Sequence, residues 1–158
     1  MASHLKCLIT MFELKDDSWF DNLDDLKKII GEHYDELSVT KTYPLDPDWD
    51  AYAELANTNK LKFITCKKDA DLVGYIIYFV VPHLHYKTCL TAFEDIYFLK
   101  KEYRKGRTGI RMFQFGDKVL KDQGVNRVIY NTKVHSDNSR LFEYLGYKCI
   151  DKVFTKLL

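Results

Sequence analysis

The stretch EYRKGRTGIRMF, from Glu102 to Phe113, joins a strand-like segment to a helix-like one. It contains four cations and two glycines: Arg104, Lys105, Gly106, Arg107, Gly109 and Arg111. The first N–H groups of a helix have no partner within the helix, and glycine lets an anion approach the backbone closely. With Arg and Lys nearby, such a turn suits a phosphate group. Its composition alone is equally compatible with a solvated basic turn.

The segments on either side of this turn predict a strand, a helix and a second strand. CLTAFEDIYFL (89–99) is apolar and aromatic at strand length. In TGIRMFQFGDKVLKDQ (108–123), apolar residues recur at helical spacing, and Gly124 is the expected stop. NRVIYNTKV (126–134) is again strand-like. This order predicts a parallel strand pair with a right-handed crossover.

The rest of the chain supplies further elements. We expect helices at 18–37, with Ser18 as N-cap, and at 49–60, and a short capped helix at 136–145. We expect strands at 5–14, 60–69, 71–81 and 147–157, with Pro82 ending the strand before it and 83–88 as a connecting loop. The second and third strands form an antiparallel hairpin. The whole predicts one α/β domain over residues 1–158, whose mixed sheet is antiparallel first and parallel later.

Composition excludes several classes of protein. The net charge is +1 and the cations gather in one turn, which argues against nucleic acid as a partner. No stretch has the length of a membrane span, and the N-terminus lacks a signal-peptide pattern. The four cysteines, far apart, are read as free thiols: Cys7, Cys66, Cys89 and Cys149. We expect a cytoplasmic protein without a metal site.

Several motifs together resemble the GNAT superfamily of N-acetyltransferases. The turn is similar to that family's acetyl-CoA motif, Arg/Gln-x-x-Gly-x-Gly/Ala: Arg104 and Gly109 match, whereas Arg107 replaces the middle glycine. SRLFEYLGYK (139–148) resembles the late helix and turn, with Gly146 and Tyr147 on the family's Gly-Phe pair. PHLHY (82–86) is similar to a subgroup often encoded by bacteriophages, for which the location would be the host cytoplasm.

The resemblance implies how an acetyl donor is held. In this family the sheet splays between its fourth and fifth strands, and the pantetheine arm of acetyl-CoA enters the gap. Backbone groups near the end of the fourth strand, here Tyr97, Phe98 and Leu99, would bind that arm. The turn would hold the pyrophosphate through Arg104, Lys105, Gly106, Arg107, Thr108 and Gly109. Asn138 lies where the family often has an Asn that touches the cofactor.

The resemblance also implies direct attack of an amine on the thioester, which needs a base and benefits from an acid. We expect Asp95, nine residues before Arg104, to be the base. Glu94 comes second, because it points to the other face of a regular strand unless a bulge intervenes. The family's usual acid, a Tyr on the late helix, is replaced by Phe142. Either water or another tyrosine, with Tyr147 as the candidate, would then protonate the thiolate.

The acceptor is expected to be a primary amine, on a small molecule or on a protein. His83, His85 and Tyr86 precede the fourth strand and are candidates for lining the acceptor pocket. Many relatives form dimers, so a homodimer is possible. The alternative reading is a catalytically weak or inactive module of this fold that binds CoA or a protein partner.

Overall fold

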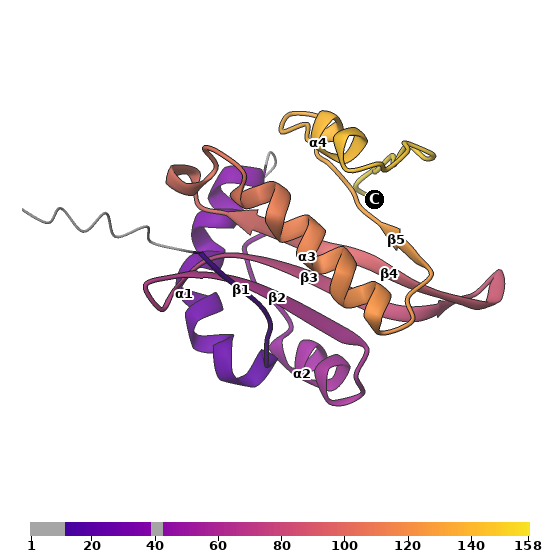
Figure 1. Cartoon of the computed structure of the whole chain (residues 1–158), viewed down its shortest axis with the longest axis horizontal. Helices are drawn as coiled ribbons and strands as arrows, with labels where there is room; N and C mark the ends of the chain where they lie inside the picture. The colour runs from indigo at the N-terminus through magenta and orange to yellow at the C-terminus, as the bar shows by residue number, and fades with distance from the viewer. Residues whose placement is uncertain (1–11, 39–42) are drawn as a thin grey trace, which may run out of the picture.

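The computed structural model describes residues 12–38 and 43–158. Its sheet has five strands in sequence order: β1 (Glu13–Asp16), β2 (Leu61–Lys68), β3 (Asp71–His83), β4 (Tyr86–Leu99) and β5 (Arg127–Ile129). The pairs from β1 to β4 are antiparallel, and β4 and β5 are parallel. This confirms the predicted mixed sheet and its parallel crossover (Figure 1).

Helices cover both faces of this sheet (Figure 1). The helices are α1 (Trp19–Leu37), α2 (Trp49–Asn57), α3 (Thr108–Asp122) and the short α4 (Ser139–Tyr144), and a 3₁₀ turn, η1 (Lys101–Tyr103), follows β4. Side chains of β3 alternate between the two faces, as a strand requires. Ile76 and Tyr78 pack with α3, whereas Tyr75 and Ile77 pack with α1.

The helix signals read from the sequence correspond to observed contacts. The Ser18 hydroxyl accepts a hydrogen bond from the Asp21 amide (3.3 Å) and so caps α1. On the buried face of α1, His33 stacks on Phe98 and shares a hydrogen bond with the Tyr75 hydroxyl (2.6 Å). Burial lowers the pKa of His33 to about 4, so its ring stays neutral at neutral pH.

Two tight connections differ in how well the sequence predicted them. The β2–β3 turn is the expected hairpin turn, with positive φ at Asp69 (52°) and Ala70 (72°). The prediction that Pro82 ends its strand is wrong, because β3 continues to His83 and β4 begins at Tyr86. Pairing with β2 stops at Phe79, so the proline sits where one side of β3 has no neighbouring strand and its missing N–H costs nothing. The expected loop at 83–88 shrinks to two linking residues.

The C-terminal part of the chain departs from the prediction. Residues 147–157 form no strand and are mostly exposed. β5 spans only Arg127–Ile129, rather than 126–134, and therefore offers a short edge for pairing. Most of the predicted first strand, 5–14, and Cys7 lie outside the described residues. Cys66, Cys89 and Cys149 are free thiols, as predicted.

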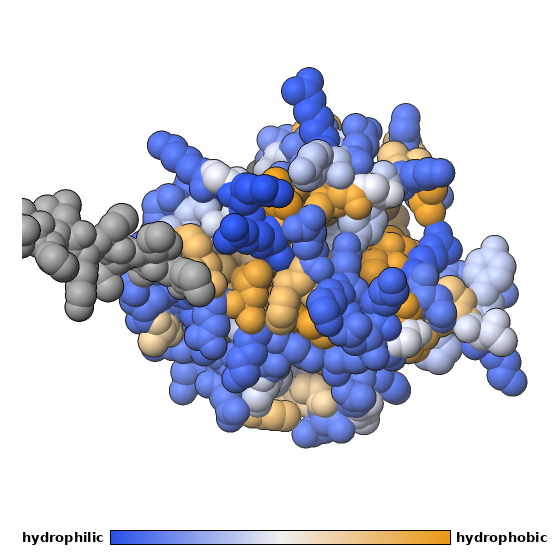
Figure 2. Space-filling model, viewed as in Figure 1, coloured by the Kyte–Doolittle hydropathy of each residue, from blue (hydrophilic) through white to orange (hydrophobic). Residues whose placement is uncertain are grey.

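Figure 2 shows a largely hydrophilic face with apolar side chains surfacing in small groups. Within residues 12–38 and 43–158, no helix combines the length and apolar character that crossing a membrane requires.

Candidate active site

The gap beside β4 is the main feature of the site. β4 pairs with β5 only from Thr91 to Phe93, so within residues 12–38 and 43–158 no strand lies beside its last residues on that side. A cavity of about 230 Å³ opens there, between the end of β4, the first turns of α3 and the segment 133–138. Five of the predicted donor-site residues line it together with Arg104: Tyr97, Phe98, Leu99, Gly109 and Asn138.

The turn before α3 presents backbone N–H groups to this cavity. The Arg111 amide closes the first helical turn by donating to the Arg107 carbonyl (2.9 Å), so the amides of residues 108–110 precede the intrahelical ladder. Gly106 has a φ of 94°, which other residues rarely adopt. Lys105 and Arg107 are exposed beside it. The turn therefore combines amides that precede the helical ladder, the positive end of a helix dipole and exposed cations.

Arg104 has a different role from its neighbours. Its Nε donates to the Leu99 carbonyl (2.6 Å), and its two terminal nitrogens donate to the two oxygens of Glu36 on α1 (2.5 and 2.7 Å). The guanidinium also lies over the Phe98 ring, 5.6 Å from its centroid. These bonds lower the pKa of Glu36. Arg104 thus fastens the turn to both α1 and β4, and its donors are largely engaged within the chain.

Glu94 and Asp95 point to opposite faces of the sheet. Ile77 pairs with Ile96 and Tyr78 pairs with Glu94, so Asp95 is an extra residue of β4 at this point. Such a bulge re-aims the side chains around it. Sequence reasoning favoured Glu94 only if a bulge interrupted the strand, and β4 contains such a bulge.

Glu94 is buried on the side of the gap. Its Oε2 accepts a hydrogen bond from the Asn131 amide (3.0 Å), just beyond β5. Burial raises its pKa to about 7, opposed by that bond and by Lys133, which also lines the cavity. A carboxyl group with this pKa is half ionised near neutral pH and can take up or release a proton there.

Asp95 lies on the α2 side. The Tyr52 hydroxyl donates to its carboxylate (2.5 Å), and the Tyr52 ring stacks on Trp19, whose centroid is 5.0 Å away. Burial raises the pKa of Asp95, and the Tyr52 hydrogen bond opposes the shift. Sequence reasoning did not find Tyr52, because its distance along the chain from β4 gave no signal.

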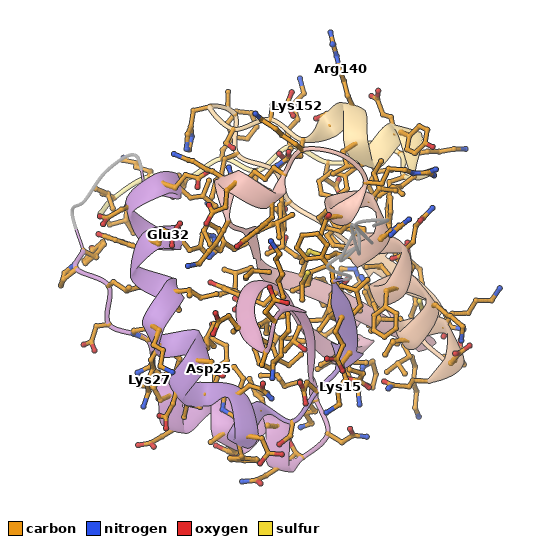
Figure 3. All side chains as sticks on the ribbon, turned by 60° about the vertical axis from the view of Figure 1, so that its left-hand side comes forward. Lys15, Asp25, Lys27, Glu32, Arg140 and Lys152 are labelled. Carbon is orange, nitrogen blue, oxygen red and sulfur yellow. The ribbon has the colours of Figure 1, made fainter. Side chains whose placement is uncertain are left out.

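Tyr97 reaches the cavity from the same face as Glu94. Its hydroxyl oxygen accepts a hydrogen bond from the Asn138 side-chain amide (2.9 Å), and its ring packs edge-on against Phe113 and Phe142. Asn138 sits at the start of α4. On the same short helix Phe142 is buried, whereas Arg140 points away from the molecule (Figure 3).

Tyr147 belongs to a separate polar group. Its hydroxyl donates to Asp117 on α3. Beside them the hydroxyls of Tyr78 and Tyr130 share a hydrogen bond of 2.5 Å. Burial raises the pKa of Asp117. Tyr147 does not line the cavity beside β4, and neither Asp117 nor Tyr130 was singled out from the sequence.

The three acceptor candidates lie at the opposite end of β4. His83, His85 and Tyr86 surround the β3–β4 turn, where their rings contact one another. The His85 amide donates to His83 Nδ1 (3.1 Å). None of the three lines the cavity.

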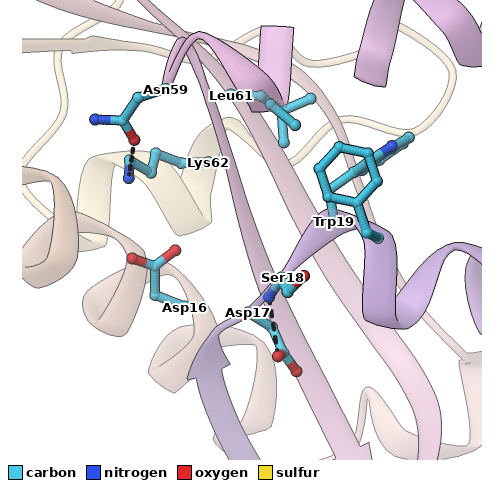
Figure 4. Close-up of a pocket in the computed structure, with 9 residues that line it drawn as sticks. Asp16, Asp17, Ser18, Trp19, Asn59, Leu61 and Lys62 are labelled. Carbon is cyan, nitrogen blue, oxygen red and sulfur yellow. Dashed lines mark hydrogen bonds between the residues drawn. The ribbon is translucent and has the colours of Figure 1, made fainter. Parts of the chain in front are cut away.

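A second hollow lies at the start of α1 (Figure 4). Asp16, Asp17 and Lys62 are among its lining residues. Asp17 pairs with Lys15 (2.9 Å), and Asp16 accepts a hydrogen bond from Gln123 (3.0 Å). Its carboxylates are thus partnered within the chain. Over the described ranges, no cluster of three His, Cys, Asp or Glu side chains is arranged to hold a metal ion.

Comparison with known proteins points to one family. The sequence profile described as the acetyltransferase (GNAT) family matches residues 20–147. No curated protein matches the sequence.

Solved structures share the fold. A ribosomal-protein-alanine N-acetyltransferase from Brucella melitensis biovar Abortus 2308 superposes with a TM-score of 0.74 at 12% identity, covering 94% of this chain and 98% of that one. Glucosamine-6-phosphate N-acetyltransferase from Arabidopsis thaliana superposes with a TM-score of 0.69 at 14% identity, covering 93% of this chain and 98% of that one. A protein from Clostridium acetobutylicum, described as a predicted acetyltransferase with acetyl-CoA, superposes with a TM-score of 0.73 at 10% identity, covering 93% of this chain and 96% of that one.

Proposed function

Since the chain belongs to the acetyltransferase (GNAT) family, we propose that it transfers an acetyl group from acetyl-CoA directly to the nitrogen of a primary amine. The observation that carries the proposal is the cavity between the end of β4 and the segment 133–138, which opens toward the first turn of α3. An extended arm ending in phosphates needs such a slot with an anion site at its mouth.

The residues around the cavity fit the donor. Among the described residues, Tyr97 and Phe98 have no strand partner on this side, so the backbone there can bind an extended arm, whereas the Leu99 carbonyl already accepts from Arg104. The amides of residues 108–110 would bind the pyrophosphate, with Lys105 and Arg107 adding charge. Arg104 would support this site through its bonds to Glu36 and Leu99 rather than through the phosphate itself.

We assign the general base to Glu94 rather than to Asp95. An alkylamine is mostly protonated at neutral pH and must lose a proton before it attacks. Glu94 is buried beside the gap, and its pKa of about 7 suits this task. Asp95 faces α2, and its carboxylate is already bonded to Tyr52. It would add negative charge that favours a cationic acceptor on that face.

The acceptor itself is proposed only as a class: a primary amine on a small molecule or a protein. Two of the compared structures are described as enzymes that act on an amino sugar phosphate and on a ribosomal protein, which supports both options. His83, His85 and Tyr86 would contact only an acceptor long enough to extend along β4. A homodimer, a cytoplasmic location and the phage-type subgroup remain predictions from the sequence.

The proposal is tested by calorimetry with acetyl-CoA on the wild type and on Gly109→Val. A Cβ at Gly109 meets nothing within 4 Å, and Gly109 lines the cavity. The added side chain should leave folding intact and weaken acetyl-CoA binding at least about tenfold, since it fills the slot. Gly31→Val on α1 is the matched control, because it adds the same atoms in open space outside the cavity.

Turnover is then measured as free thiol released from acetyl-CoA with a panel of amines. Thiol release that depends on an amine supports the enzyme. Tight CoA binding without release across the panel would favour the alternative, a binding module of this fold. Wild-type protein that binds no acetyl-CoA would refute the transfer reaction and the CoA-binding module, and would leave only a module that binds a protein partner.

A further inference from the structure

The leaving thiolate in such a transfer needs a proton, and the cavity offers few groups to supply it. The proton-bearing side chains that line it, among the described residues, are Arg104, Lys133, Tyr97, Ser136 and Asn138, with Glu36 held by Arg104. Arg, Ser and Asn side chains do not give up protons near neutral pH. This leaves Tyr97 and Lys133, and the exposed Lys133 ammonium strongly prefers hydration.

The hydrogen bonds around Tyr97 leave its proton available. Asn138 Nδ2 donates to the hydroxyl oxygen (2.9 Å), so the oxygen already has a donor and its own O–H is free to turn toward the cavity. Burial raises the pKa of Tyr97, and the side-chain hydrogen bonds with Asn138 and Thr132 oppose that rise. These groups would stabilise the phenolate that remains once the proton has left.

The ring is also held in place. Phe113 of α3 lies edge-on to Tyr97 with centroids 5.2 Å apart, and Phe142 of α4 lies edge-on at 6.0 Å. Neither neighbour carries a charge. The charged groups that influence the pKa of the Tyr97 hydroxyl are Glu94, on the same strand, and Asp137, and both raise it. Lys133 lines the same cavity.

We propose that Tyr97 is the general acid that protonates the departing CoA sulfur. The inference rests on the proposed function. The amine nitrogen forms a bond to the carbonyl carbon, the C–S bond breaks, and the sulfur takes the Tyr97 proton. The nitrogen loses its remaining excess proton, which returns to the phenolate through water, while Glu94 holds the proton taken from the ammonium beforehand. The products are the amide, the CoA thiol and one proton that Glu94 releases to solvent.

The position of Tyr97 along β4 agrees with this role. It lies between Leu99, next to the anion-binding turn, and Glu94, the proposed base. A donor whose phosphates occupy the turn and whose arm follows β4 backwards would bring its sulfur past Leu99 toward Tyr97. The acid and the base then lie on one face of the strand, near opposite sides of the reacting carbonyl.

The test uses CoA itself and needs no acceptor. The thiol of CoA bound to the protein is titrated by its thiolate absorbance, in the wild type and in Tyr97→Phe. A hydrogen bond to the thiolate should hold the bound thiol's pKa in the wild type roughly one to two units below its value in Tyr97→Phe. Tyr43→Phe, at an exposed tyrosine outside the cavity, is the matched control and should titrate as the wild type does.

Binding of desulfo-CoA, which lacks the sulfur, reports whether the site is intact. Equal desulfo-CoA binding with a raised thiol pKa in Tyr97→Phe supports the inference, and equal thiol pKa values overturn it. Failure of the wild type to bind CoA refutes the proposed function instead. If Tyr97→Phe loses desulfo-CoA binding, the test is made instead with 3-fluorotyrosine at position 97. Its more acidic phenol should lower the pKa of the bound thiol below the wild-type value. An unchanged thiol pKa overturns the inference.

Kinetics provide a second readout once an amine acceptor has been found. Tyr97→Phe should lower kcat about a hundredfold or more, the usual contribution of general acid catalysis, with KM for acetyl-CoA nearly unchanged. If the ring were merely structural, kcat would stay at its wild-type value, because the variant keeps the ring and its packing. That result would also overturn the inference.

Discussion

At the scale of single residues, the neighbours Glu94 and Asp95 show how one extra residue in a strand decides which carboxyl group shares a face with Tyr97. Glu94 faces Asn131 and the gap, whereas Asp95 faces Tyr52 on α2. Sequence reasoning placed Asp95 first because it lies nine residues before Arg104, and placed Glu94 second because a regular strand turns it to the opposite face, with a bulge as the exception. A bulge arises from long-range pairing with β3, so the sequence pattern of β4 alone could not reveal it.

Glu94→Gln should raise stability and lower turnover together. The pKa of Glu94 is raised by folding from 4.5 to about 7, so the folded state binds more protons in that window and stability falls as pH rises through it. Above about pH 7 the uncharged variant should be more stable than the wild type, by up to about 3 kcal/mol, and below about pH 4.5 the difference should vanish. Urea unfolding at pH 8 and pH 4.5 measures this.

The same variant should lose about a hundredfold or more of amine-dependent thiol release, and wild-type turnover should rise with pH through about 7. Asp95→Asn is the matched comparison, since it removes a neighbouring charge on the other face. If Asp95→Asn loses more turnover than Glu94→Gln, the base is Asp95 and our assignment is reversed.

At the scale of elements, the turn between β4 and α3 depends on a contact with α1. Arg104 reaches Glu36 with two hydrogen bonds, and Lys100 lies 3.5 Å from Glu32 on the same helix. The sequence predicted the strand, the turn and the helix, because apolar spacing and glycine act locally. It assigned the Arg104 side chain to phosphate, since Glu36 is distant in the chain and no local pattern marks it as the partner.

We expect Arg104→Ala, Glu36→Ala and the double variant to weaken acetyl-CoA binding by a similar, several-fold amount. The reason is that each breaks the same contact and loosens the same turn. The partly exposed pair should contribute at most about 1 kcal/mol to stability. Calorimetry on all three variants distinguishes the roles. A much larger loss for Arg104→Ala than for Glu36→Ala would show that the guanidinium contacts the donor directly.

At the scale of the whole molecule, the order of elements up to α4 was predictable and the β5 end of the sheet was not. Helices α1 and α3 follow from apolar faces, from the start signal at Ser18 and from the stop signal at Gly124. The alternating pattern at 147–157 suggested a strand, but a strand forms only where another offers its edge, and β5 is too short to do so. The cavity exists for the same reason, because β4 extends beyond the last residue of β5 that pairs with it.

Hydrogen exchange with and without acetyl-CoA tests the central claim, that this gap binds the donor, most directly. Bound acetyl-CoA should slow the exchange of amides at 97–99, 108–110 and 133–138, with the β3–β4 turn at 83–86 as an internal control that stays unchanged. Binding that leaves the first three segments unprotected, or that protects residues 16–19 and 59–62 around the second hollow instead, would contradict the account.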